Sequence, residues 1–238
     1  MKKITTVLFD LDGTLIRMDQ DEFIKVYFAT IVSKLSSLGY DGELVYNALC
    51  EAVRATIRND GTMINEERFW STLEFNMPGL RGQAKSVIDD FYAHDFVKVI
   101  EASCDKYPRA KEIVDLVKSR GLRPVLATNP LFPIIATYKR MEFGGLCAED
   151  FDYVTAYENS SYCKPDPNYL RELLYKLHLS ADECVMIGND TRDDCRTADP
   201  LGIPVFLLTE CLINRDNVDL SAYPHGDFDK LVEYLENL

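Results

Sequence analysis

The most constraining feature of the sequence is a pair of aspartates that directly follows a short apolar stretch near the N-terminus. Residues 4–9 read as a buried strand, and Asp10 and Asp12 come where that strand should end. Gly13 permits the sharp turn that follows, because glycine adopts positive φ without a steric penalty. In an open α/β sheet, ligands bind at the carboxyl ends of the strands. The stretch therefore predicts an α/β sheet with a ligand site at the end of its first strand.

Two carboxylates at this spacing suit the binding of a divalent cation and the transfer of a charged group. Residues two apart on an extended segment point to the same side, so Asp10 and Asp12 can face one bound group. Their repulsion is relieved by a shared proton or by a cation, and a hard ion such as Mg²⁺ prefers oxygen ligands. One carboxylate is then available as a nucleophile and the other for proton transfer. The alternative is that Asp12 and Gly13 only form a turn.

Three further stretches follow in a fixed order. Residues 125–129 (VLATN) are an apolar run that ends in threonine and asparagine, and Lys164 precedes a proline. Residues 185–190 (VMIGND) are another apolar run with a carboxylate at its end, and Asp194 follows Asp190 after four residues. Together with the first stretch, these motifs resemble those of the haloacid dehalogenase superfamily of hydrolases, in its phosphoglycolate phosphatase-like subgroup. The four motifs span most of the chain.

The resemblance implies a division of roles among the aspartates. Asp10 would attack phosphorus and form an aspartyl-phosphate, while Asp12 would protonate the leaving oxygen and later deprotonate the attacking water. A Mg²⁺ ion would be held by Asp10, by Asp12 through its backbone carbonyl, and by Asp190. Asp194 lies about one helical turn beyond Asp190, so it would support either a metal-bound water or Lys164.

The resemblance also implies a phosphate-binding set that lies outside the first motif. Thr128 would donate its hydroxyl to a phosphoryl oxygen, and the backbone N–H of Asn129 would be a second donor. Lys164 would neutralise charge on the transferring group. A lysine before a proline is usually a surface residue, and its place between the second and fourth motifs is what assigns Lys164 to the site.

The distance along the chain between the first two motifs predicts an inserted domain. An ordinary βα unit returns to its sheet within ~30 residues, whereas Thr128 follows Asp10 after several times that length. The intervening residues show helical periodicity, beginning with Asp19 and Glu22 at the spacing of a capping box. By resemblance this segment is a helical type 1 cap, which closes over the site and shapes substrate choice. We expect a core domain of residues 1–16 and 104–238 and a cap domain of residues 17–103.

The rest of the pattern alternates strands with helices, which predicts a doubly wound parallel sheet of the Rossmann-like α/β class with an inserted all-helical cap. Strands are expected at residues 4–9, 124–127, 153–156, 184–187 and 205–208. Helices are expected at residues 23–38, 43–58, 66–75 and 83–93 in the insertion, and at 108–121, 133–141, 167–177, 191–201 and 228–235 in the core.

The charge balance argues against nucleic acid and membrane partners. The chain has 26 basic and 39 acidic side chains, for a formal net charge of −13. A small anionic substrate is not excluded, because a metal ion and one lysine can invert the field locally. No stretch approaches the ~20 apolar residues of a membrane span, there is no signal peptide pattern, and the seven cysteines lack metal-binding spacing. We expect a cytoplasmic protein with free thiols.

The residue at position 12 selects the reaction class. Dehalogenases and phosphonate-cleaving members of the superfamily lack an aspartate at the position of Asp12, so the resemblance favours phosphoryl transfer. The expected enzyme is a Mg²⁺-dependent phosphatase that hydrolyses a small phosphorylated metabolite. A phosphoglucomutase-like phosphotransferase uses the same motifs and cap type and is the alternative. A non-catalytic protein that binds Mg²⁺ and phosphate is a third reading, which turnover of any phosphoester would distinguish.

Overall fold

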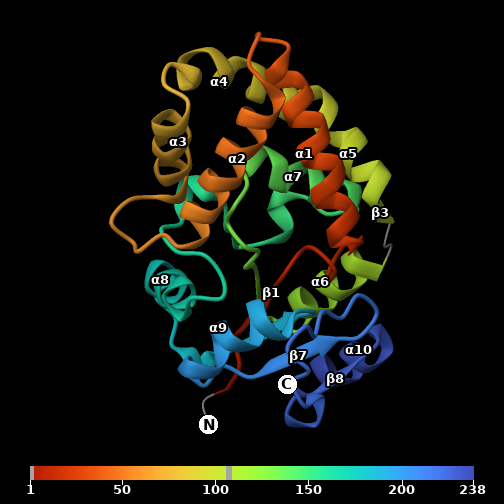
Figure 1. The fold of residues 1–238 in the computed structure, drawn as a ribbon. Coiled ribbons are helices and arrows are strands. Elements are labelled where there is room, and N and C mark those ends of the chain that lie inside the picture. The colour runs from red at the N-terminus through yellow and green to blue at the C-terminus, as the bar shows by residue number, and fades with distance from the viewer. Residues whose placement is uncertain (1–2, 106–108) are drawn as a thin grey trace.

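The computed structural model describes residues 3–105 and 109–238, and within them lies a six-stranded sheet, in the lower half of the molecule in Figure 1. The strands run in the order β5-β4-β1-β6-β7-β8, and each neighbouring pair is parallel. The first five in chain order lie where the sequence predicts strands, and the sixth was not predicted. Their bounds are β1 (Thr6–Phe9), β4 (Arg123–Leu126), β5 (Tyr153–Val154), β6 (Cys184–Gly188), β7 (Val205–Leu208) and β8 (His225–Gly226).

Helices cover this sheet and make up most of the insertion. The insertion holds α1 (Gln20–Ser36), α2 (Gly42–Ile57), α3 (Asn65–Asn76), α4 (Leu80–Asp90) and α5 (Phe96–Ser103), and the core holds α6 (Arg109–Ser119), α7 (Ile134–Phe143), α8 (Pro167–Leu177), α9 (Arg196–Ala198) and α10 (Phe228–Glu236). The predicted start of α6 at Pro108 lies outside the described residues. In the part of the chain that the structure describes, no helix combines the length and the apolar character needed to cross a membrane.

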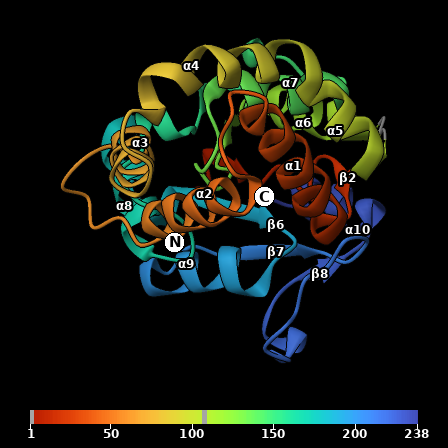
Figure 2. The same ribbon diagram turned by 45° about the horizontal axis from the view of Figure 1, so that its top comes forward.

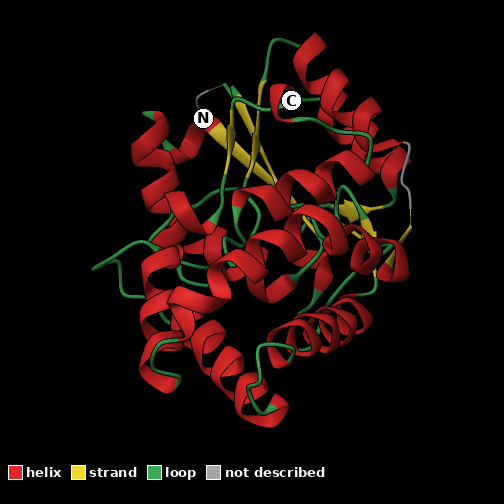
Figure 3. Cartoon of the chain, turned by 90° about the horizontal axis from the view of Figure 1, so that it is seen from above, coloured by secondary structure: helices red, strands yellow, loops and turns green. Residues whose placement is uncertain are grey.

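The sheet is doubly wound because successive strand residues point to opposite faces. In β1, Val7 and Phe9 pack into one hydrophobic cluster with α6, α7 and α10, whereas Leu8 packs into a second cluster with α8 and α9. Seen from above, the strands lie between helices (Figure 3). Both faces are therefore buried, which explains why the strands are apolar throughout rather than alternating. The predicted fold class is confirmed.

The insertion is helical, and it differs from the prediction at its last helix. The helix expected at residues 83–93 begins at Leu80, and helical backbone continues through a π turn, η1 (Phe91–Asp95), into α5. After Gly82 no glycine or proline occurs before Ser103, so nothing in the sequence breaks the helix. The predicted end near Ala93 is wrong. Figure 2 shows α3, α4 and α5 arching around α1 and α2.

The chain enters and leaves the insertion side by side. Two short strands, β2 (Arg17–Met18) and β3 (Cys104–Asp105), pair antiparallel at its two ends. The backbone N–H of Asp19 donates to the carbonyl of Ser103 over 3.1 Å. Asp19 also caps α1 as predicted, because its carboxylate accepts a 3.0 Å hydrogen bond from the N–H of Glu22. These contacts join the ends of the segment that the sequence assigns to a separate domain.

A second attachment links the insertion to the loops around the predicted site. Asn65, at the start of α3, is fully buried. Its side-chain amide donates to the backbone carbonyls of Pro130 and Tyr162, each over 3.2 Å. These two acceptors lie next to the stretches that carry Asn129 and Lys164. One asparagine of the insertion therefore touches both loops that the sequence assigns to phosphate binding.

Candidate active site

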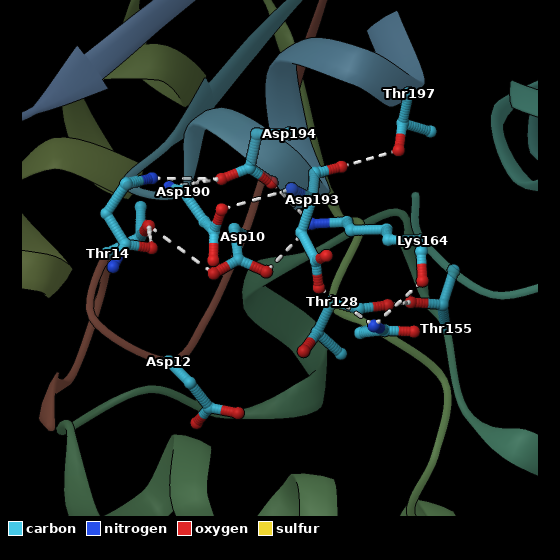
Figure 4. Close-up of polar contacts among 12 residues, drawn as sticks. Asp10, Asp12, Thr14, Thr128, Thr155, Lys164, Asp190, Asp193, Asp194 and Thr197 are labelled. Atoms are coloured by element: carbon cyan, nitrogen blue, oxygen red, sulfur yellow. Dashed lines mark hydrogen bonds and ion pairs between the residues drawn. The ribbon is translucent and has the colours of Figure 1, made fainter. Parts of the chain in front are cut away.

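The predicted site residues come together at the carboxyl ends of three adjacent strands. Asp10 follows β1, Thr128 follows β4 and Asp190 follows β6, with β1 between the other two strands. The chain passes from β1 to β4 on one side and later returns to β6 on the other, so the strand order reverses at β1. Ligands in open α/β sheets bind at such reversal points. Figure 4 shows the resulting cluster of side chains.

Lys164 is a buried cation that joins two carboxylates of this cluster. Its Nζ lies 2.8 Å from Asp10 Oδ1 and 2.7 Å from Asp194 Oδ1, and its side chain is 1% exposed. Burial alone lowers the pKa of a lysine, but the charges of Asp10 and Asp194 outweigh it and hold the pKa of Lys164 well above its ordinary value. Lys164 is therefore charged and fixed in place at neutral pH.

Asp194 connects Lys164 to the loop that follows β6. Its Oδ2 accepts hydrogen bonds from the backbone N–H groups of Asn189, at 2.9 Å, and Asp190, at 3.0 Å. Gly188 makes this approach possible, because a Cβ at that position would lie 2.0 Å from Asp194 Oδ2. The sequence leaves two partners open for Asp194, a metal-bound water or Lys164, and the structure shows the contact with Lys164.

The Asp10 carboxylate is held from two sides. Lys164 contacts Oδ1, and the hydroxyl of Thr14 lies 3.4 Å from Oδ2 and 3.0 Å from Asn189 Oδ1. Gly13, with φ of 84°, brings the turn against Asn189, whose Nδ2 would be 2.2 Å from a Cβ at that position. Burial raises the pKa of Asp10 to about 7, although Lys164 acts in the opposite direction. The side chain keeps 12% of its surface exposed, so the carboxylate is still accessible.

Asp12 points away from Asp10 and toward α7 (Figure 4). There its Oδ2 pairs with Nη1 of Arg140, a residue of α7 whose side chain is 1% exposed. Burial raises the pKa of the Asp12 carboxyl, while Arg140 and Lys164 act in the opposite direction. The guanidinium stacks on Phe132, with 4.7 Å between Cζ and the ring centroid, and Nη2 donates to Thr137 Oγ1 over 3.3 Å. Arg140 therefore fixes the direction of the Asp12 side chain.

The loop after β4 is held through its backbone and through Asn129. The carbonyl of Thr128 accepts hydrogen bonds from Thr155 Oγ1, at 2.8 Å, and from the hydroxyl of Tyr169, at 2.9 Å. The side-chain amide of Asn129 donates to Asp193 Oδ2 over 3.0 Å. Thr128 is therefore anchored by its backbone, and its hydroxyl takes no part in these bonds.

Asp10 and Asp190 supply oxygen donors suited to a hard cation. Their carboxylates point toward one another in Figure 4, and Asp190 Oδ1 accepts hydrogen bonds from the N–H groups of Arg192 and Asp193, at 2.7 and 3.2 Å. Among the described residues, no three Asp, Glu, His or Cys side chains form a metal-binding group. Because the Asp12 side chain is paired with Arg140, the carboxylates of the predicted metal site that are available to a cation are those of Asp10 and Asp190.

The cluster faces a cavity of about 520 Å³ that lies between the strand ends and the insertion. The charged and amide side chains that line it outside the insertion are Asp12, Asn129, Lys164, Asp190, Arg192, Asp193 and Arg215. Residues of the insertion line the opposite side. The volume falls within the range of ~300–1,000 Å³ that is typical of small-molecule sites.

Two parts of this arrangement were not predicted from the sequence. One is the contact between Thr14 and Asn189. These residues lie within the first and fourth motifs, beside Gly13 and Asp190, so the motifs themselves could have indicated that the two side chains meet. Arg140 is separated from Asp12 by 128 residues and lies in no motif. In the sequence it looks like any arginine within a predicted helix, and only the packing of α7 against the turn after β1 reveals its contact with Asp12.

Comparison with known proteins identifies the family of the chain. The chain matches the haloacid dehalogenase-like hydrolase family over residues 4–202. It is 30% identical to phosphoglycolate phosphatase from Vibrio cholerae over 213 residues, which cover 88% of this chain and 86% of that protein. It is 26% identical to ribulose-1,5-bisphosphate 5-phosphatase from Halopiger xanaduensis, with 85% of this chain and 84% of that protein covered.

A solved structure supports the fold separately. The 2-haloacid dehalogenase from Pseudomonas syringae pv. Tomato superposes with a TM-score of 0.65 at 16% identity, covering 98% of this chain and 99% of that one. At this identity the likeness concerns the fold alone. Taken with the family match and the curated relatives, the chain is a phosphoric monoester hydrolase that belongs to the haloacid dehalogenase-like family, in its phosphoglycolate phosphatase-like subgroup.

Proposed function

We propose that the enzyme is a Mg²⁺-dependent phosphatase that hydrolyses a small phosphomonoester in two steps at Asp10. In the first step, a carboxylate oxygen of Asp10 attacks phosphorus, the ester P–O bond breaks, and Asp12 gives its proton to the leaving oxygen. In the second, Asp12 takes a proton from water, whose oxygen attacks phosphorus and displaces the Asp10 carboxylate. Phosphate leaves, and Asp10 and Asp12 return to their starting states.

The observation that carries this proposal is the pair of contacts from Lys164 to Asp10 and Asp194. A buried ammonium 2.8 Å from the proposed nucleophile supplies positive charge where a phosphoryl group would arrive. Its second contact, to Asp194, fixes its position before substrate binds. A surface lysine would have neither property. The hydroxyl of Thr128 and the backbone N–H of Asn129 are the remaining donors we assign to the phosphate.

The separate orientation of Asp12 supports its assignment to proton transfer. A carboxylate that served only as a second metal ligand would point toward Asp190, whereas Asp12 is held on the cavity side by Arg140. Burial favours the protonated form of Asp12, and the opposing charge of Arg140 keeps the ionised form accessible. Both forms are needed, since the same group donates a proton in one step and accepts one in the next.

We assign the cation to Asp10, Asp190 and the backbone carbonyl of Asp12. Bound there, Mg²⁺ would offset the repulsion between the anionic nucleophile and the anionic phosphate. The protein's own part is to hold Asp190 ready, which it does through the two backbone N–H groups that bond its Oδ1. Lys164 holds the Asp10 carboxylate in place through its contact with Oδ1.

We also propose that residues 17–103 act as a cap domain on a core of residues 1–16 and 104–238. The pairing of β2 with β3 supports this division, since the two connections to the core lie next to each other. The cavity between the strand ends and α1–α4 supports a role in covering the substrate. A lid in this position would exclude water from the covalent intermediate until the first product leaves.

The test is turnover of a panel of phosphorylated metabolites by the purified protein with Mg²⁺, with excess chelator, and with the Asp10→Asn variant. Relatives named for phosphoglycolate, ribulose-1,5-bisphosphate and glyceraldehyde 3-phosphate define the starting panel. Release of inorganic phosphate that needs both Mg²⁺ and Asp10 is the expected result. Transfer of phosphate to a sugar rather than water would identify a phosphotransferase, and binding of phosphoesters without turnover would identify a non-catalytic protein.

A further inference from the structure

The side of the cavity formed by the insertion is almost entirely apolar. Its side-chain polar atoms belong to Gln20, Tyr27, Tyr92 and Trp70, and no charged side chain from residues 17–103 reaches the cavity in the described structure. The two tyrosine hydroxyls on this side bond each other, because Tyr27 and Tyr92 lie 2.8 Å apart. The apolar and aromatic lining residues are Met18, Phe23, Ile24, Tyr27, Phe28, Ile31, Val53, Ile57, Phe69, Trp70, Ile88 and Tyr92.

Charges around the cavity all come from outside the insertion, and most of them are negative or already paired. Asp12, Asp190 and Asp193 line it, and Lys164 is committed to Asp10 and Asp194. Two arginines also reach it, both with exposed side chains: Arg192 and Arg215, the second of which pairs with Asp21 over 3.1 Å. The cations of this cavity thus lie at its exposed edge or beside the aspartates, and a carboxylate placed against the insertion would face apolar side chains, which is unfavourable.

We propose that the leaving group of the physiological substrate is a bulky apolar one, an alkyl or aromatic group at least as large as a six-membered ring. This inference rests on the proposed function, because it places the phosphate at Asp10 and Lys164 and the leaving group against α1–α4. Burial of hydrocarbon against Phe23, Ile57 and Trp70 would supply binding energy, whereas a hydroxylated sugar would lose hydrogen bonds to water without replacement. The expected preference differs from the phosphoglycolate for which the Vibrio cholerae relative is named.

Two matched pairs of primary alkyl phosphates test the proposal. Isobutyl phosphate has the shape of phosphoglycolate, with methyl groups in place of the carboxylate oxygens. Cyclohexylmethyl phosphate has the ring size and linkage of glucose 6-phosphate without its hydroxyls. The apolar member of each pair should have a kcat/KM at least about 10-fold higher, and cyclohexylmethyl phosphate should exceed isobutyl phosphate. Equal or higher kcat/KM for the polar members would overturn the proposal.

Binding decides the question separately from catalysis. Calorimetry with Mg²⁺ should give a lower Kd for 2-cyclohexylethylphosphonate than for 3-phosphonopropionate, by about 10-fold or more. The reverse order would overturn the inference even if the enzyme is active. Acetyl phosphate serves as the control for the core, since it is small and activated. Failure to hydrolyse acetyl phosphate, with the apolar phosphonate still preferred, would contradict the proposed function and leave only the apolar binding preference of the cavity.

A charge placed on the apolar side should shift the preference toward the substrate that carries a carboxylate. Ile57, at the end of α2, lines the cavity and is 38% exposed, so a lysine fits there without being buried. Ile57→Lys should raise kcat/KM for phosphoglycolate relative to isobutyl phosphate by about 10-fold. Leu44→Lys, on the same helix but not in the cavity, is the matched control and should leave the ratio unchanged. An unchanged ratio in both variants would contradict the placement of the leaving group.

Discussion

The two sides of the cavity are built by different means. On the strand side, Asp10, Lys164 and Asp194 are fixed by hydrogen bonds and ion pairs of 2.7–3.0 Å, and a shift of one disturbs the others. On the insertion side, rings and aliphatic chains are held mainly by packing, as where Phe23 and Tyr27 stack with 6.1 Å between their ring centroids, and the hydrogen bond between Tyr27 and Tyr92 joins two of the rings. Directional bonds fix a position for phosphorus, whereas packing sets only the size and polarity of the space left for the leaving group. The reaction should therefore depend on the first side and the choice of substrate on the second.

The largest effect should come from Asp10→Asn, because the amide keeps the shape but removes the attacking charge. Turnover should fall by about 10⁴-fold or more on every substrate, as for other nucleophile replacements. Steady-state rates on an alkyl phosphate and on acetyl phosphate measure this, with a circular dichroism spectrum to verify the fold. Retention of more than about a tenth of the activity would mean that Asp10 is not the nucleophile.

Lys164→Met should have the next largest effect and should separate the two sides of the cavity. Loss of the ammonium should lower kcat/KM by roughly 10²–10³-fold on all phosphoesters together, since each presents the same phosphoryl group. Lys176→Met, on the exposed face of α8, is the control and should leave kcat/KM unchanged on every substrate. A Lys164→Met variant that changed the ranking of substrates would break the assignment of specificity to the insertion.

The burial of Asp10 should appear as a dependence of stability on pH in the metal-free protein. Its pKa is raised to about 7 in the folded state, from an unfolded value near 3.8. Between these two pH values the folded state still binds the proton that the unfolded state has lost. The free energy of unfolding therefore falls as pH rises, and the whole destabilisation by ionised Asp10 is present above about pH 7. At about 1.4 kcal/mol per pKa unit, the total is on the order of a few kcal/mol.

Thermal unfolding of wild type and Asp10→Asn without metal isolates this contribution. At pH 8 the variant should melt at a higher temperature than wild type, and the difference should shrink toward pH 4. Mg²⁺ at pH 8 should stabilise wild type more than the variant, because it binds the ionised carboxylate in the folded state. A difference between the two proteins that stayed constant with pH would mean that Asp10 is not destabilised by burial.

The smallest expected effect concerns Arg140, which orients Asp12 without touching the phosphate in the proposed scheme. Arg140 acts against the upward shift of the Asp12 pKa, so its loss should raise that pKa further. The alkaline limb of the kcat profile for an alkyl phosphate should then move to higher pH by roughly 1 unit or more in Arg140→Met. Arg140→Lys keeps the charge and should keep the limb in place. A limb unmoved in the methionine variant would exclude Asp12 as the proton donor.

Much of the core could be predicted from the sequence because its features are local. The apolar runs of β1, β4 and β6 are each followed within two residues by the residue that the site uses, so strand and site are encoded together. The helical content of the insertion follows in the same way from its periodicity and from the cap at Asp19. These inferences need no knowledge of which segments meet in space.

The rest depends on tertiary contacts that leave no periodic pattern. β2, β3 and β8 have two residues each, and they are strands only because a distant partner lies beside them. Arg140 is recognisable as the partner of Asp12 only once α7 packs against the β1 turn. The apolar side of the cavity reads in the sequence as ordinary helix packing, since a stripe of Phe and Tyr has the same spacing whether it faces a helix or a substrate.

The most direct test of covalent catalysis by Asp10 is the stereochemistry at phosphorus. A phosphorothioate ester made chiral with oxygen isotopes would be hydrolysed in isotopically labelled water, and the configuration of the released thiophosphate determined. Attack by Asp10 followed by attack of water inverts phosphorus twice, so the expected result is net retention of configuration. Net inversion would mean a single direct attack by water and would contradict an aspartyl-phosphate intermediate.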